Sequence, residues 1–264
     1  MKKYTLGVIG GGFMARAILS GAFSKKILSP KEVLVCDPSA ECRAYFTSVG
    51  ADVSERNLPA VQNCRYLLFA VKPQNFAAAI EELRGQQFPV VISIMAGKTI
   101  AGIREATGAE KIARVMPNLP CSIGAGMSAV DASRLDNEDR NFVLGLFLSA
   151  GEVIETEEAQ LNAVTAVSGS GPAYIYLFLR AFISAAMEQG LREEQARTLV
   201  FQTMEGGLSM AKTSPKSLDE LIAAVSSKGG TTVAALESFA RDGFDAAISR
   251  AVAAAGQRAE ELSE

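Results

Sequence analysis

The chain has 264 residues, 48% of them hydrophobic, which is enough for a nucleotide-binding domain with a smaller partner domain. Its formal net charge of −3 shows no long run of one sign. This argues against nucleic acid or an anionic membrane as the main partner, because both require a basic surface. The four cysteines form no CxxC pair and the sequence has no histidine, so we expect reduced thiols and no metal site.

Neither a signal peptide nor a membrane span is expected. The apolar run Tyr4–Ile9 is short and breaks at three consecutive glycines, which suits a strand that enters a turn. The longest apolar stretch, Ala173–Met187, is too short to cross a bilayer and contains Arg180. We therefore expect a soluble, cytoplasmic protein.

The first part of the chain alternates short apolar runs with helical patterns. The expected strands are Thr5–Ile9, Val33–Cys36, Tyr66–Val71, Val90–Ile94, Ile112–Met116, Met127–Val130 and Val153–Glu155. The expected helices are Phe13–Ser24, Ala40–Ser48, Phe76–Leu83, Ile100–Ala106 and Asn137–Ala150. Continuous apolar strands indicate burial on both faces, as in a parallel sheet covered by helices. The pattern predicts a doubly wound, Rossmann-like α/β domain.

The strand pattern stops near residue 160, and only helical patterns follow. They predict helices over Ala173–Met187, around Ala196–Ala211, after the capping-box pair Ser217 and Glu220, and over Thr232–Arg241 and Asp245–Leu262. We therefore expect a dinucleotide-binding domain at 1–160 and an all-α domain at 161–264. The helix Ala173–Met187 is apolar nearly all round, which favours either a subunit interface or a central core position.

A glycine-rich turn follows the first strand and opens the first helix. Gly10, Gly11, Gly12, Phe13, Met14 and Ala15 match a GxGxxG/A fingerprint in the required strand–helix context. Gly10 permits the tight turn, Gly12 lets a pyrophosphate approach the backbone, and Ala15 lets the helix pack closely on the strand. The phosphates are expected on the helix N-terminus, where free N–H groups favour an anion.

Asp37 ends the second strand. A carboxylate at this position typically accepts hydrogen bonds from an adenosine ribose and repels a 2′-phosphate, which favours NADH. Asp37 also fits a plain turn-former in Asp37-Pro38-Ser39, and Arg43 is close enough in sequence to accept a phosphate.

Two polar loops precede helices of the second half. Ser168-Gly169-Ser170-Gly171-Pro172-Ala173 predicts a polar, closely approachable turn, or only a capping loop. Val225–Thr232 combines hydroxyl side chains, two glycines and a helix N-terminus, which together make a natural site for a carboxylate. The alternative for the second loop is an N-cap after a flexible turn.

Several motifs in order resemble those of the pyrroline-5-carboxylate reductase family, over essentially the whole chain. They are Gly10–Ala15, Ala70–Gln74, Ser93–Gly97, Arg114–Pro120, Ser168–Tyr174 and Ser226–Thr232. Leu119 stands where the family usually has threonine, and Lys228 where proline is frequent. The resemblance implies an NAD(P)H-dependent oxidoreductase that reduces 1-pyrroline-5-carboxylate to L-proline, the last step of proline biosynthesis.

The resemblance also implies site residues. Asn57, Ala70, Val71, Lys72, Pro73, Ala96 and Gly97 would join the glycine-rich turn along NADPH or NADH. Ser227 and the backbone of Gly230 and Thr231 would bind the substrate carboxylate, and Thr232 would hydrogen-bond the ring nitrogen. Ser227 and Thr232 are thus the expected catalytic residues. The helical domain would intertwine with a second subunit, giving a homo-oligomer.

The reaction asks little of the protein, because a protonated imine is already electrophilic and the cofactor supplies hydride. A β-hydroxyacid dehydrogenase is an unsuitable alternative, since its lysine–asparagine pair cannot exist where Asn162 is the only asparagine after residue 160. Reductases of six-membered cyclic imines and a non-catalytic nucleotide sensor remain alternatives.

Overall fold

The computed structural model describes residues 3–263. The chain divides into two compact units. Unit 1 comprises Met1–Pro172 together with Ala255–Glu264, and unit 2 comprises Ala173–Ala254. Unit 1 is an α/β unit built on a sheet, and unit 2 is helical, so the predicted fold class is confirmed.

Within residues 3–263, unit 1 contains one eight-stranded sheet, with neighbours in the order β3-β2-β1-β4-β5-β6-β7-β8. Neighbouring strands are parallel except β6 and β7, which are antiparallel. The strands are β1 (Tyr4–Ile9), β2 (Val33–Cys36), β3 (Asp52–Ser54), β4 (Cys64–Phe69), β5 (Val90–Ser93), β6 (Ile112–Pro117), β7 (Gly126–Asp131) and β8 (Gly151–Glu155).

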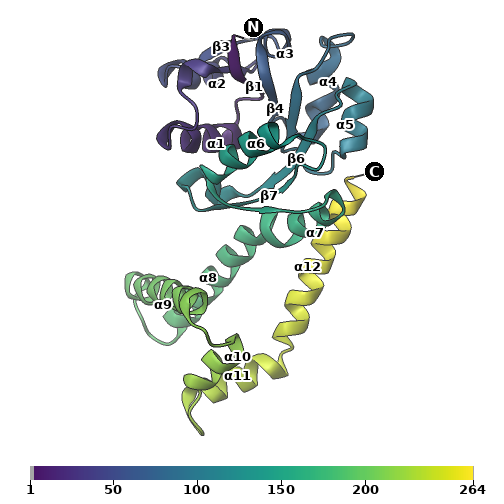
Figure 1. Cartoon of the computed structure of the whole chain (residues 1–264). Helices are drawn as coiled ribbons and strands as arrows, with labels where there is room; N and C mark the ends of the chain where they lie inside the picture. The colour runs from purple at the N-terminus through teal and green to yellow at the C-terminus, as the bar shows by residue number, and fades with distance from the viewer. Residues whose placement is uncertain (1–2, 264) are drawn as a thin grey trace. The chain divides into compact units, whose positions relative to one another are not determined.

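Helices cover both faces of this sheet (Figure 1). They are α1 (Phe13–Ser24), α2 (Ala40–Ser48), α3 (Leu58–Asn63), α4 (Phe76–Glu81), α5 (Ile100–Thr107) and α6 (Asn137–Leu148). One apolar layer joins the sheet to α1, α2 and α6, and a second joins it to α3, α4 and α5.

The continuous apolar strands follow from this double burial. Successive residues of a strand point to opposite faces. In β4, Tyr66 and Leu68 enter the first layer, while Leu67 and Phe69 enter the second. Both faces of Tyr66–Phe69 are therefore buried, and the charged Arg65, which is exposed, lies before this stretch of β4.

Polar side chains cap the starts of α2, α5 and α6, whereas Asn57 before α3 and Asn75 before α4 form no such bond. Ser39 accepts a hydrogen bond from Cys42 N at the start of α2, and Asp136 accepts one from Asp139 N at the start of α6. Each bond satisfies one of the N–H groups that a helix leaves free at its first turn. Helix α1 has no such cap.

Unit 2 is formed by α8 (Gly171–Glu188), α9 (Glu193–Thr213), α10 (Leu218–Ala224), α11 (Thr231–Arg241) and α12 (Phe244–Glu261), with the ends of α8 and α12 in unit 1. The predicted capping box of α10 is present, since Glu220 N donates to Ser217 Oγ and Ser217 N donates to Glu220 Oε2. The hydrogen bond from the Ser217 backbone N–H, followed by that of the Ser217 side chain, lowers the pKa of the Glu220 carboxyl.

Helix α8 buries none of its side chains in the single chain. Its exposed large apolar residues are Ile175, Tyr176, Leu177, Phe182 and Met187. The interpretation of this helix as a central core helix is therefore wrong.

The prediction of a polar turn at Ser168–Ala173 is also wrong, because most of this segment is helical. Residues Leu161–Val164 form α7, and Thr165–Gly169 continue it as a π-helical turn. Ser170 N donates to the carbonyl oxygen of Thr165 at 2.9 Å, which is the i to i+5 bond of that turn. The segment is helical almost without a break up to α8, and Pro172 lies in the first turn of α8, where proline is tolerated.

Candidate cofactor and substrate sites

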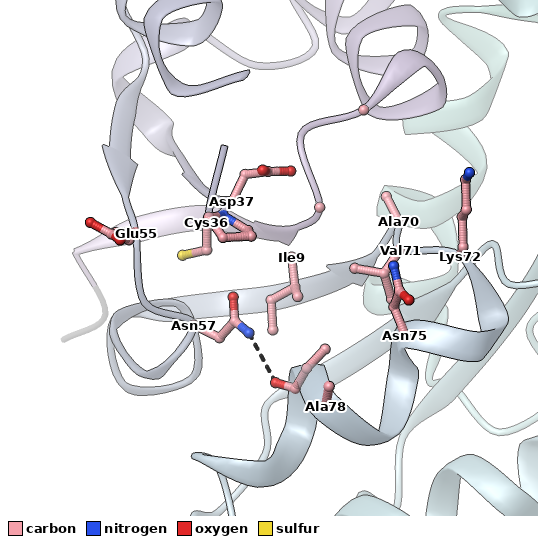
Figure 2. A pocket seen from close by; sticks show the side chains of 14 residues that line it. Ile9, Cys36, Asp37, Glu55, Asn57, Ala70, Val71, Lys72, Asn75 and Ala78 are labelled. Carbon is pink, nitrogen blue, oxygen red and sulfur yellow. Dashed lines mark hydrogen bonds between the residues drawn. The ribbon is translucent and has the colours of Figure 1, made fainter. Parts of the chain in front are cut away.

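A cleft of about 500 Å³ lies at the carboxyl ends of the strands of unit 1. Figure 2 shows the side chains around it. Its lining residues are Ile9, Gly10, Gly12, Cys36, Asp37, Pro38, Glu55, Asn57, Ala70, Val71, Lys72, Asn75, Ala78 and Ala79. They come from the ends of β1, β2, β3 and β4 and from the segments that follow these strands.

The position of the cleft follows from the strand order. From β1 the chain runs outward to β2 and β3, and then returns to place β4 on the other side of β1. Such a reversal opens a crevice outside the carboxyl ends of the strands, which is where open α/β sheets bind their ligands.

The glycine-rich turn is tight at Gly10 and open at Gly12. Gly10 has φ +99°, and a Cβ atom there would lie 2.8 Å from the carbonyl carbon of Ala70. A Cβ at Gly12 would meet no atom within 4 Å. The space above Gly12 therefore admits a ligand, while Ala15 is fully buried between helix and sheet.

The start of α1 suits an anion. No side chain caps it and no acidic residue lies in its first turn. The first N–H groups of a helix have no partner within the helix, and its dipole favours negative charge at this end. A pyrophosphate fits here without displacing any protein hydrogen bond.

The carboxylate of Asp37 is fixed at the rim of the cleft. Its Oδ2 accepts a hydrogen bond from Gly11 N at 2.7 Å, and its Oδ1 accepts one from Ser39 N at 2.8 Å. Each carboxylate oxygen can accept two hydrogen bonds, so both retain capacity toward a ligand. Asp37 is both a turn-former and an available acceptor, and the two sequence interpretations do not exclude each other.

Asn57 reaches the cleft with a fixed side chain. Its Nδ2 donates to the carbonyl oxygen of Ala79 at 2.9 Å, which turns its Oδ1 toward the cleft (Figure 2). Its backbone N donates to Glu82, which also accepts from Arg56 Nε at 3.0 Å. Burial alone would raise the pKa of Glu82, but these hydrogen bonds hold it below its ordinary value. The charged carboxylate thus anchors the Asn57 segment.

Ala70, Val71 and Lys72 follow β4 and line the cleft, and Pro73 starts the short helix Pro73–Asn75 behind them. Gly11, Phe13, Met14, Ala15 and Pro73 flank the cleft without lining it. Ala96 and Gly97 follow β5 at the same edge of the sheet, outside the cleft. A Cβ at Gly97 would collide with the backbone of Leu262, so the end of the chain covers this glycine.

The sequence analysis missed several cleft residues. They are Ile9, Cys36, Pro38, Glu55, Asn75, Ala78 and Ala79. Ile9, Cys36 and Pro38 adjoin the predicted Gly10 and Asp37, so the ends of the strands were a usable signal. Asn75, Ala78 and Ala79 reach the cleft because of the way the α4 segment packs, which no local pattern reveals.

Cys36 contributes a buried thiol to the cleft. Burial, together with the neighbouring Cys64, raises the pKa of the Cys36 thiol to about 12. The thiol is therefore protonated at neutral pH and acts as a small apolar group, not as a nucleophile.

The predicted substrate residues lie together in unit 2, in the loop between α10 and α11. Gly229 has φ +73°, and Gly230 N donates to the carbonyl oxygen of Ser227 at 2.9 Å. A Cβ at Gly230 would lie 2.6 Å from Ser227 Oγ, so the serine hydroxyl stands over the start of α11. That start has no side-chain cap and no acidic residue. The loop offers hydroxyl and free N–H donors to a carboxylate, and Thr232 is half-buried beside them.

Among residues 3–263, no group of three histidine, cysteine, aspartate or glutamate side chains gathers to hold a metal ion. In the same range, no helix combines the length and apolar character needed to cross a membrane.

Comparison with known proteins identifies the family. Residues 158–262 match the family described as pyrroline-5-carboxylate reductase dimerisation, and residues 5–97 match the family of coenzyme F420-dependent NADP oxidoreductases. The pyrroline-5-carboxylate reductase of Synechocystis sp. is 37% identical over 260 residues, which is 97% of each chain. The chain belongs to the pyrroline-5-carboxylate reductase family.

Solved structures of pyrroline-5-carboxylate reductases support the same family assignment. The pyrroline-5-carboxylate reductase of Coxiella burnetii is 31% identical, with a TM-score of 0.89 over 99% of each chain. The pyrroline carboxylate reductase of Plasmodium falciparum with NADP bound is 28% identical, with a TM-score of 0.89 over the whole of both chains. The predicted family and enzyme class are confirmed: the chain is an NAD(P)H-dependent oxidoreductase that acts on a cyclic imine.

Proposed function

We propose that the chain reduces 1-pyrroline-5-carboxylate to L-proline with two sets of residues, the cleft of unit 1 and the loop Ser226–Thr232 of unit 2. The loop is the observation that carries this proposal. It places four hydroxyl side chains around an uncapped helix start, next to a lysine and without an acidic residue in the first turn. A small carboxylic acid is the ligand that this combination suits best.

The substrate carboxylate is anchored by Ser227 Oγ, by the backbone N–H of Thr231 and by the backbone N–H of Gly230, which gives up its bond to the Ser227 carbonyl oxygen when the carboxylate binds. The N-terminus of α11 adds a favourable dipole, and Lys228 adds a positive charge at the same loop. These donors fix the position of the ring, so that orientation is set before the reaction begins.

The Thr232 hydroxyl binds the ring nitrogen. A hydroxyl both donates and accepts, so it bonds the nitrogen before and after the nitrogen gains its proton. The carbon of the C=N bond gains a hydride, the nitrogen keeps one proton from solvent, and the product is a secondary amine. No strong side-chain base is needed, which agrees with a sequence that has no histidine.

The cofactor is held by the cleft residues and by the turn around them. The residues that we assign to it are Gly10, Gly11, Gly12, Phe13, Met14, Ala15, Asp37, Asn57, Ala70, Val71, Lys72, Pro73, Ala96 and Gly97. The reduced nicotinamide supplies the hydride. The open space at Gly12, the uncapped start of α1 and the spare acceptors of Asp37 all favour a dinucleotide here.

We assign cofactor binding to residues 1–160, and substrate binding and dimerisation to residues 161–264, which are the two domains predicted from the sequence. The match to the dimerisation family and the exposed apolar residues of α8 support self-association through the C-terminal helices. The oligomeric state can be measured by analytical ultracentrifugation.

The chain acts in the cytoplasm. None of its four cysteines, all of which lie among the described residues, forms a disulfide, as is usual in a reducing compartment. Fractionation of cells with an antibody against the chain tests this location.

Steady-state kinetics test the proposed function. With NADH or NADPH, the purified chain should oxidise the cofactor only when 1-pyrroline-5-carboxylate is added. Activity should be lower on the six-membered imine, because the carboxylate and nitrogen contacts are fixed together. A chain that binds the dinucleotide but never oxidises it is a sensor, and this result would refute the proposal.

Two substitutions test the assigned roles. Thr232→Ala should lower kcat by roughly 100-fold with little change in cofactor affinity, as expected for a group that acts on the reacting atoms. Ser227→Ala should mainly raise KM for the substrate. Ser226→Ala is the matched control, because the Ser226 hydroxyl already donates to the carbonyl oxygen of Ile222 at 2.7 Å.

A further inference from the structure

We infer that the adenosine end of the cleft selects NADH over NADPH by the fixed carboxylate of Asp37, by the exposed carboxylate of Glu55 and by arginines that are already engaged. This inference deepens the proposed function and rests on the cofactor site described above. Its residues are Asp37, Glu55, Arg43 and Arg56.

Asp37 offers acceptors in a fixed direction. The bonds from Gly11 N at 2.7 Å and Ser39 N at 2.8 Å hold its two oxygens in place. Each oxygen has capacity for one more hydrogen bond, which suits the two hydroxyls of an unphosphorylated ribose. A 2′-phosphate has no hydroxyl proton to donate at that position and brings further negative charge.

Glu55 adds a second negative charge at the same end of the cleft, as Figure 2 shows. Its side chain is 72% exposed, so water and salt screen its charge. We therefore expect Glu55 to contribute less than Asp37 and to contribute less still at high ionic strength.

Arg43 could neutralise a phosphate, but its guanidinium is already held beside Glu55. Its Nη1 donates to the carbonyl oxygens of Asp37 at 2.8 Å and Pro38 at 2.7 Å. Its Nη2 lies 3.7 Å from Glu55 Oε2, and only 22% of the side chain is exposed. The two carbonyl bonds fix the guanidinium in place, so a phosphate that approaches its remaining N–H groups must compete with the Glu55 carboxylate.

Arg56 and Lys72 are poorly placed to neutralise a 2′-phosphate. Arg56 is paired with Glu82 at 3.0 Å. Among the described residues that line the cleft, Lys72 is the only cation, and it lies at the opposite end from Asp37 and Glu55 (Figure 2). An NADPH phosphate would thus meet two carboxylates, while the guanidinium of Arg43 is shared with Glu55.

Ligand binding tests the inference without catalysis. Calorimetry should show that the wild-type chain binds ADP-ribose at least about tenfold more tightly than 2′-phospho-ADP-ribose, a difference of about 1.4 kcal/mol. The ratio of kcat/KM for NADH over NADPH should favour NADH by a similar factor. A wild-type chain that binds the phosphorylated ligand more tightly would overturn the inference.

Two variants separate the contributions. Asp37→Asn keeps an acceptor oxygen for the backbone while removing the charge, and should reduce the preference by roughly tenfold. Glu55→Gln should reduce it by about two- to threefold at low salt and by less at high salt. An unchanged preference in both variants would refute the role of these carboxylates.

The matched control is Glu152→Gln. It removes the same charge from β8, which is the opposite edge strand of the sheet from the β2–β3 side. The preference of this variant for NADH over NADPH should equal that of the wild type. If Glu152→Gln loses as much of the preference as the Asp37 and Glu55 variants do, only net charge matters and the inference is overturned. If both ligands bind with the expected ratio but no imine is reduced, the inference stands and the proposed function fails.

Discussion

The side-chain amide of Asn118 donates to the carbonyl oxygen of Ser168 at 3.2 Å, and its Oδ1 accepts from Met127 N at 2.8 Å. One side chain thus joins the turn after β6 to both β7 and the π-helical turn before α8. Two sequence motifs that lie 50 residues apart meet through this amide. The start of α8 is thereby tied to the carboxyl end of β6.

Replacing Asn118 by alanine should destabilise unit 1. The half-buried Met127 N–H and Ser168 carbonyl would lose their partner, which costs about 1–3 kcal/mol. Urea unfolding followed by circular dichroism measures this loss. Ser122→Ala removes only a local bond from an exposed hydroxyl to Leu119, so it is a suitable control. Equal stability of Asn118→Ala and wild type would contradict this role.

Alanine substitutions at Gly10 and Gly12 should affect different properties of the chain: the first its folding stability and the second its affinity for NADH. Gly10→Ala forces a side chain into a positive φ and against the Ala70 backbone, so it should cost about 2 kcal/mol or more of folding stability. Gly12→Ala meets open space and an extended backbone, so thermal stability should hardly change. Its Kd for NADH should nevertheless rise by roughly tenfold or more, because the methyl group occupies the expected pyrophosphate position.

Thermal melts with and without NADH distinguish the two effects. A Gly12→Ala chain that binds NADH like the wild type would show that the pyrophosphate does not approach this glycine.

The cysteines should differ sharply in reactivity. Cys36, Cys64 and Cys121 are buried, whereas Cys42 is partly exposed. Burial raises the pKa of both Cys36 and Cys121, which further suppresses their thiolates. Iodoacetamide at pH 8 should therefore modify Cys42 first in the native chain, as peptide mass spectrometry can show. Fast modification of Cys36 before unfolding would contradict its place in the interior.

The free energy of unfolding should depend on pH through the ionisation of Asp136. A hydrogen bond from the backbone of Asp139, with Lys111 nearby, lowers the pKa of Asp136 from 3.8 to about 2. Since the folded pKa lies below the unfolded one, this contribution is fully present above the unfolded value and is lost as the pH falls from about 4 toward 2.

Asp136→Asn tests this dependence, because asparagine also caps a helix well but carries no charge. The wild type should be the more stable protein at pH 6, and the difference in free energy of unfolding should shrink at pH 3. A difference that stays constant over this range would show that Asp136 does not titrate as described.

The buried strands could be predicted from sequence because double burial leaves a distinct pattern. Val33–Cys36 has no polar residue, and its observed bounds are the predicted ones. Strand β3 was missed since Asp52–Ser54 has one apolar residue, and α3 was missed since six residues containing Pro59 show no clear period. Apolar patterns do not encode strand direction, so the antiparallel pairing of β6 and β7 required the structure.

Some residues of the candidate site could likewise be predicted from the sequence, and others could not. Gly10 and Asp37 have local signals, since a tight turn and a strand end constrain the residue type. Glu55 reaches the cleft because β3 pairs with β2, and Glu82 supports Asn57 from the turn that follows α4. Such partners depend on tertiary packing. No local pattern in the sequence reports them.

The most direct measurement is a crystal structure of the assembled protein with NADH and a non-reactive proline analogue. We expect the pyrophosphate at the N-terminus of α1 and the analogue carboxylate on Ser227, Gly230 and Thr231. We also expect the ring nitrogen on Thr232 and the ring beside the nicotinamide. An analogue bound away from this loop, or a loop remote from every nicotinamide in the assembly, would contradict the account.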